Sequence, residues 1–219
     1  MSAEFFPKKI HMIIGHSGAG KTTFLKLLNG LIKPLSGRIK INNAELEYKK
    51  LTPRKEIGYI PQDMGLIQNL SVEHNILLGV LHRTNSLKSV FNIFPKKEKE
   101  LADHLLESLG IAEKKFEKVK YLSGGQKRRV AIARALIQKP KILLADEILS
   151  DIDFIQANKI MENLKKIKSQ MDVTIIMVEH DMCITRQFAD ELSIIKRGSL
   201  LHDININELL ESDACKYFL

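Results

Sequence analysis

The fold is decided by residues 15–22, which read GHSGAGKT. This stretch matches the pattern G-x-x-x-x-G-K-[ST], which is typical of loops that bind the phosphates of a nucleoside triphosphate. The apolar run at 10–14 precedes it, and residues 22–28, closed by Asn29-Gly30, have the pattern of a helix. The order strand, loop, helix directs backbone N–H groups and the positive end of a helix dipole at one point, where an anion would bind.

We expect ATP and Mg²⁺ to bind at this loop. Its glycines allow the backbone to close around the phosphates without Cβ clashes. The Lys21 ammonium can reach the β and γ phosphates and is expected to serve catalysis as well, and the Thr22 hydroxyl can ligate Mg²⁺. The expected nucleotide-binding residues of this segment are Gly15, Ser17, Gly18, Ala19, Gly20, Lys21, Thr22 and Thr23.

Two acidic residues directly follow the apolar run at 142–145. In open α/β sheets, ligands bind at the carboxyl ends of the strands, which is where this run delivers them. Asp146 is suited to hold the magnesium ion, and Glu147 is placed to orient and polarise an attacking water. Combined with the glycine-rich loop, this pair predicts hydrolysis of the nucleotide.

The rest of the chain alternates strand and helix patterns. Strands that are apolar at nearly every position, as at 173–178, belong to parallel sheets covered on both faces. Further strands are expected at 38–42, 57–60 and 192–195, and an acidic helix at the C-terminus. We therefore predict one α/β domain over 1–219, a P-loop NTPase (RecA-like) core of mainly parallel sheet at 1–68 and 123–219, with a helical subdomain inserted at 69–122.

Composition narrows the class of protein further. No run in the 219 residues approaches the ~18 apolar residues that cross a bilayer. Cys183 and Cys215 are too few for a disulfide framework, so a reducing cytosol is expected. The net charge of +8 permits nucleic acid or an anionic membrane surface as a partner, and composition does not choose between them.

The segment LSGGQ at 122–126 resembles the signature sequence of ABC ATPases. Three further segments resemble motifs of that family and occur in its order: PQD at 61–63 the Q-loop, SDID at 150–153 the D-loop, and EHD at 179–181 the switch-histidine motif. The resemblance covers nearly the whole chain. It implies an ATPase that works as a head-to-tail dimer.

In that family, the signature segment of one subunit closes over the γ-phosphate held by the P-loop of the other. The resemblance assigns Gln62 to magnesium and to sensing the membrane subunit, Asp153 to communication across the dimer, and His180 to the γ-phosphate and the attacking water. Gln62 and Asp153 are both expected to belong to the nucleotide site. It also implies integral membrane permease subunits and a solute-binding protein as partners, no nucleic acid, and a peripheral location on the cytoplasmic face of the inner membrane. The residues expected to contact the partner's nucleotide are Ser123, Gly124, Gly125 and Gln126.

A closer similarity, to phosphonate-importer ATPases, rests on residues 87–97. An exporter, a lipoprotein-extraction system and a soluble ABC ATPase remain alternatives.

The sequence also departs from the family pattern. The antiparallel strands ahead of the P-loop are shortened, with Phe5 and Phe6 expected to pack in the core. Ile148 stands where the family typically has proline, and Asp151 where it has a small residue.

Overall fold

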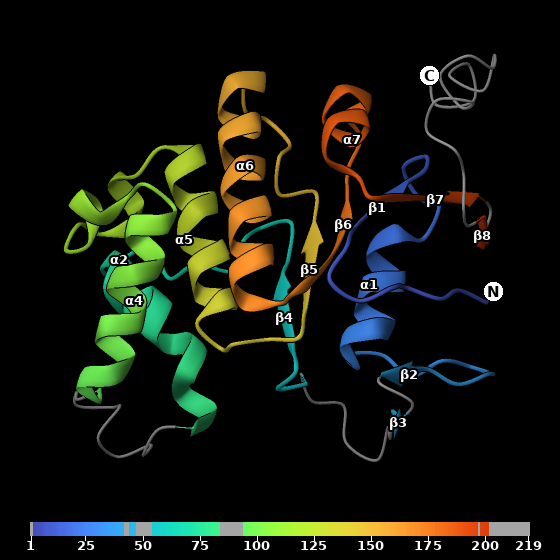
Figure 1. Ribbon diagram of the computed structural model, residues 1–219, viewed down its shortest axis with the longest axis horizontal. Coiled ribbons are helices and arrows are strands. Elements are labelled where there is room, and N and C mark those ends of the chain that lie inside the picture. Colours follow the sequence, from blue (N-terminus) through green and yellow to red (C-terminus); the bar gives the residue numbers. More distant parts are fainter. Residues whose placement is uncertain (1, 42–43, 47–53, 84–93, 197, 202–219) are drawn as a thin grey trace.

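The computed structural model describes residues 2–41, 44–46, 54–83, 94–196 and 198–201. Most of the segment that resembles phosphonate-importer ATPases, 87–93, and the helix expected at the C-terminus lie outside these residues. Within the described part, the elements alternate in the predicted strand-helix order around the glycine-rich loop (Figure 1). The structure therefore confirms an α/β fold.

The central sheet has the strand order β4-β5-β6-β1-β7-β8 within the described residues. Neighbours from β4 to β7 are parallel, and β8 runs antiparallel to β7. A separate antiparallel pair joins β2 to β3. The strands are β1 (Ile10–Ile14), β2 (Lys40–Ile41), β3 (Ala44–Glu45), β4 (Ile57–Ile60), β5 (Ile142–Asp146), β6 (Thr174–Val178), β7 (Glu191–Lys196) and β8 (Ser199–Leu201).

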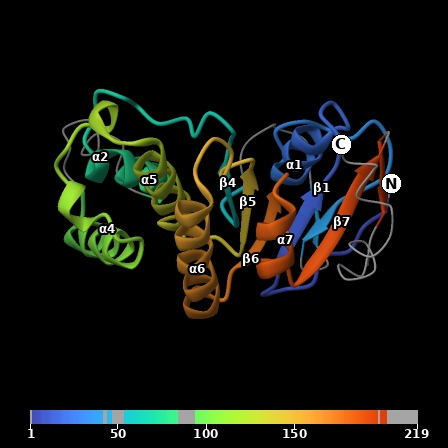
Figure 2. The same ribbon diagram turned by 90° about the horizontal axis from the view of Figure 1, so that it is seen from above.

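Helices cover both faces of this sheet, as Figure 2 shows with α1 on one side and α6 and α7 on the other. Because side chains alternate along a strand, Leu143 packs in the larger core cluster with α5 and α6, whereas Leu144 packs in the smaller one with α1. The α-helices are α1 (Lys21–Asn29), α2 (Val72–Leu77), α4 (Lys96–Ser108), α5 (Gly124–Leu136), α6 (Phe154–Met171) and α7 (Met182–Phe188).

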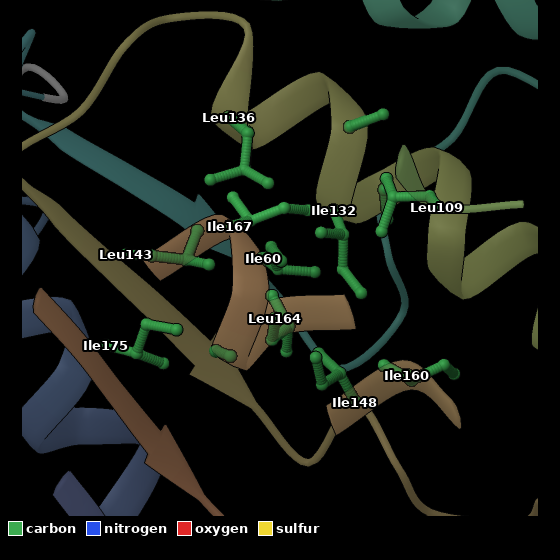
Figure 3. Packing of buried hydrophobic residues seen from close by; sticks show 14 of the residues in the cluster. Ile60, Leu109, Ile132, Leu136, Leu143, Ile148, Ile160, Leu164, Ile167 and Ile175 are labelled. Atoms are coloured by element: carbon green, nitrogen blue, oxygen red, sulfur yellow. The ribbon is translucent and has the colours of Figure 1, made fainter. Parts of the chain in front are cut away.

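The larger cluster ties the turn after β5 to the helical layer. Figure 3 shows Ile148 among Ile160 and Leu164 of α6, with Ile132 of α5 and Ile60 of β4 close by. Ile148 is only 2% exposed. The residue that departs from the family pattern is thus a buried apolar anchor for the turn that carries Glu147.

The helices of the predicted insertion at 69–122 pack against α5. Helices α2 and α4 both contact α5, and the 3-10 helix η1 (Leu78–Arg83) follows α2 directly. Arg83 at its end donates to Glu98 of α4 and to the backbone carbonyl of Ile137. These contacts connect α2, η1 and α4 to α5, the signature helix, which begins next to Ser123.

Two local predictions need correction. The strand expected at 38–42 begins later than predicted, because β2 covers Lys40 and Ile41, and the Ile39 carbonyl accepts from the Leu46 N–H beyond the pairing with β3. Residue 42 lies outside the described residues. Phe5 packs as expected, edge-on to His11 and near Phe24, but Phe6 is 44% exposed. The ammonium of Lys9 lies 5.0 Å from the Phe6 ring centroid, so this ring is a surface partner for a cation rather than part of the core.

Candidate nucleotide-hydrolysing site

The sheet register brings the predicted motifs to one edge. Asp146 is in register with Val178, and Ile13 is in register with Val178 on the other side of β6. Ile60 is in register with Ala145. The glycine-rich loop, Glu147, Gln62 and His180 each follow one of these strands within a few residues. They therefore meet at the carboxyl end of the sheet, where ligands of open α/β folds bind.

The loop has the backbone conformation of an anion cradle. Gly18 and Gly20 have φ of 75° and 101°, in the left-handed region, and Gly20 caps the N-terminus of α1. The Lys21 ammonium turns back to donate to the carbonyls of Gly15 and His16, at 2.8 and 3.0 Å. Burial lowers the pKa of Lys21, and the carboxylates of Glu147 and Asp146 oppose that shift. The cation is thus fixed at the rim of the loop.

Gly15 is required by a close backbone approach. A Cβ at this position would overlap the carbonyl oxygen of Ile195 in β7. Gly15→Ala is therefore expected to destabilise the protein by about 1–3 kcal/mol and to weaken ATP binding, because the loop must shift away from β7. Thermal unfolding and nucleotide titration measure both effects. Gly110→Ala, where φ is 66° but the methyl group meets open space, gives the cost of the left-handed backbone alone.

Asp146 has the properties of a magnesium ligand. It is 1% exposed, and neither carboxylate oxygen has a hydrogen-bond partner among the described residues. Burial raises its pKa, while the nearby Thr22 hydroxyl acts in the opposite direction. A buried, unsatisfied carboxylate beside a hydroxyl suits a hard cation that takes oxygen ligands. Thr22 and Asp146 therefore fit Mg²⁺, whereas the amide of Gln62, the third predicted ligand, donates to Glu147 in this structure.

Glu147 lies at the centre of the remaining polar groups. Its Oε1 is 2.6 Å from Nε2 of His180 and 3.9 Å from Nζ of Lys21. Its Oε2 accepts a hydrogen bond from the Gln62 amide at 3.0 Å. The structure thus brings together the glutamate, histidine, glutamine and lysine that were predicted from separate motifs.

The Q-loop is held from the signature helix. Arg134 of α5 donates to the backbone carbonyls of Gly65 and Met64, at 2.6 and 2.5 Å. Burial and the Asp146 carboxylate raise the pKa of Tyr59, on the strand that leads to this loop, to about 12. Arg134 and Tyr59 belong to no sequence motif. Their neighbours, Gly65 and Asp146, come from distant segments, so no local sequence pattern identifies them.

The signature residues lie elsewhere. Ser123 caps α5 by accepting from the Gln126 backbone N–H, and the Gln126 side chain accepts from the Ser123 N–H, which completes a capping box. Asp153 caps the neighbouring helix α6, and a Cβ on Gly125 would overlap the Gln156 amide in that helix. In Figures 1 and 2, α5 and α1 lie at different parts of the sheet. The N-termini of α1 and α5 therefore lie apart within one chain.

A glycine cradle, a fixed lysine, a buried aspartate and an adjacent glutamate at the end of a parallel strand define a P-loop NTPase. Residues 1–150 match the family model described as ABC transporter. The chain belongs to the ABC transporter family. Among the described residues, no helix is both long and apolar enough to cross a lipid bilayer.

Relatives of known designation support the same family. The chain is 38% identical over 214 residues to the phosphonates import ATP-binding protein PhnC of Fusobacterium nucleatum, covering 96% of this chain and 87% of that protein. It is 39% identical over 199 residues to phosphonates import ATP-binding protein PhnC 2 of a Nostoc species, covering 90% and 81%.

Solved structures agree with the fold. CbiO1 from Clostridium perfringens, described as part of the ABC transporter complex CbiONQ, superposes with a TM-score of 0.84 at 29% identity, over 98% of this chain and 84% of that one. The ATP-binding cassette MJ0796, a dimer in a post-hydrolysis state bound to ADP and phosphate, gives 0.77 at 29% identity, over 93% and 89%.

Proposed function

We propose that this chain hydrolyses ATP to power uptake of phosphonate or a related oxyanion through membrane permease subunits. Family membership and the phosphonate-import relatives support an ATP-binding subunit of an ABC transporter. The observation that carries the mechanism is the separation of the two anion-binding helix termini in one chain. Two chains facing head to tail would bring the signature of each to the P-loop of the other.

Within such a dimer, the residues of this chain have distinct tasks. The backbone N–H groups of the glycine-rich loop and the Lys21 ammonium bind the phosphates and oppose their charge. Mg²⁺, held by Thr22, Asp146 and Gln62, would add positive charge at the phosphates when bound. Glu147 is placed to accept a proton from the attacking water, and His180, 2.6 Å from it, to orient that carboxylate and contact the γ-phosphate.

The partner's Ser123, Gly124, Gly125 and Gln126 would complete the pocket. Their helix terminus offers N–H groups and a positive dipole end to the γ-phosphate. Release of phosphate would remove the charge that these groups share, so the dimer would open after hydrolysis. Closing and opening of the dimer would move the permease, which the ATPase contacts on the cytoplasmic face of the inner membrane. A solute-binding protein would supply the solute on the opposite face of that membrane.

Reconstitution tests the substrate assignment. The chain is purified with a candidate permease from the same organism, placed in liposomes with a candidate solute-binding protein, and assayed for ATPase activity with methylphosphonate, phosphate or an amino acid. We expect stimulation by methylphosphonate, and by phosphate if related oxyanions are accepted. Stimulation by the amino acid alone, or no association with the permease, would refute the proposed import function.

A further inference from the structure

Arg128 is a charged residue buried near the catalytic turn but assigned to no motif. It lies in α5, and only 8% of it is exposed. Its Nη2 donates to the backbone carbonyl of Ser150, in the turn that follows β5. A buried guanidinium is costly unless its donors and charge are matched, so this position requires a structural or functional reason.

The contact to Ser150 continues directly to the catalytic glutamate. The Ser150 hydroxyl donates to the backbone carbonyl of Glu147 at 2.8 Å, and the Ser150 N–H reaches the same oxygen at 3.3 Å. The guanidinium therefore holds a backbone group whose own residue holds Glu147. Two hydrogen bonds therefore connect α5 to the backbone of Glu147, the first from Arg128 to Ser150 and the second from Ser150 to Glu147.

The turn needs this support because its backbone is in an uncommon conformation. Glu147 has a φ of 49° and Asp151 a φ of 57°, both in the left-handed region that residues with a Cβ rarely adopt. Such positions persist only when neighbouring contacts over-determine them. Within the turn, Ile148 packs in the hydrophobic core, and the Ser150 carbonyl accepts a hydrogen bond from Arg128.

Two nearby carboxylates also favour the charged form of the Arg128 guanidinium. Burial lowers the pKa of Arg128, and the carboxylates of Asp151 and Glu179 act against that change. Glu179 in turn accepts from the backbone N–H of His180 at 2.8 Å. The unusual Asp151 thus contributes a negative charge that favours a buried arginine at position 128.

We propose that Arg128 is a positioning residue for ATP hydrolysis, which keeps the turn at 147–151 in the geometry that holds Glu147 beside His180 and Gln62. It acts through Ser150 and does not touch the nucleotide. This inference rests on the hydrolysis proposed above.

The test compares Arg128 variants of the ATPase assembled with its permease. Arg128→Met is expected to lower kcat for ATP about 10- to 100-fold, the loss that follows a displacement of about 1 Å of a catalytic group. KM for ATP stays within about twofold, since the P-loop is intact. Arg128→Lys, which keeps the charge and one donor, recovers most of the rate. Arg129→Met is the matched control, because Arg129 points to the carbonyl of Gly110 instead.

A second arm separates positioning from general destabilisation. In a Glu147→Gln background, adding Arg128→Met leaves the residual rate unchanged, because the group it positions is already gone. An equal fractional loss in both backgrounds, or a raised KM with normal kcat, would overturn the inference. Arg128→Gln serves the same comparison if the methionine variant is too unstable to purify. Absence of hydrolysis by the unmodified assembly would instead refute the proposed function itself.

Discussion

Glu147→Gln lowers kcat for ATP hydrolysis by about 100- to 10,000-fold, the range expected for loss of a general base, while ATP affinity changes little. The amide keeps the size of the side chain and can still contact Gln62 and His180, but it cannot accept the proton of the attacking water. The Lys21 and P-loop contacts to the phosphates are not altered, so binding persists. Steady-state release of phosphate and titration with a fluorescent ATP analogue measure the two quantities.

Glu162→Gln is the matched control for this substitution. Glu162 is exposed on α6, so the same chemical change there is expected to leave kcat unaltered. An unchanged rate in Glu147→Gln would show that another group activates the water. In that case, the short contact between Glu147 and His180 would be a structural hydrogen bond.

Lys21→Met removes the cation fixed at the rim of the phosphate loop and is expected to weaken ATP binding about 30- to 5000-fold. This corresponds to roughly 2–5 kcal/mol, the usual cost of truncating one partner of a buried charge pair. Hydrolysis at saturating ATP falls as well, because the ammonium is placed to oppose charge on the γ-phosphate. Calorimetric titration with Mg²⁺-ATP measures the affinity.

Lys33→Met provides the comparison for Lys21, since it removes the same charge from an exposed position in the loop after α1. Its effect on affinity is expected to stay within about twofold, because exposed charges are screened by solvent and salt. Equal losses in the two variants would indicate that net charge, and not the fixed position of Lys21, governs nucleotide binding.

The sequence predicts the parts of the site that local patterns encode. Residues 15–22 specify their own loop conformation, and the acidic pair at 146–147 follows an apolar run whose end faces the same edge of the sheet. Gln62 and His180 were assigned through family resemblance. Their meeting with Glu147 depends on β4 and β6 flanking β5, which is a property of the strand order rather than of either motif.

Other features of the site could not be predicted from the sequence. Arg128 reaches Ser150, and Arg134 reaches Gly65, across distances in sequence that no periodicity connects. The left-handed backbone at Glu147 is imposed by the surrounding turn, since the residue itself disfavours it. Ile148 was noted only as a departure from the family pattern. Its role as a buried anchor becomes visible once α6 is packed against β5.

In the proposed mechanism, the P-loop of one chain and the signature of another form a single ATP pocket. The most direct test is the molar mass, by light scattering, of Glu147→Gln saturated with Mg²⁺-ATP, alone and in complex with the permease. We predict two ATPase chains per assembly with ATP, and loss of that pairing when Ser123 is replaced by arginine. If the protein is saturated with ATP yet remains a single copy, both alone and in complex with the permease, the two motifs do not form a shared ATP pocket.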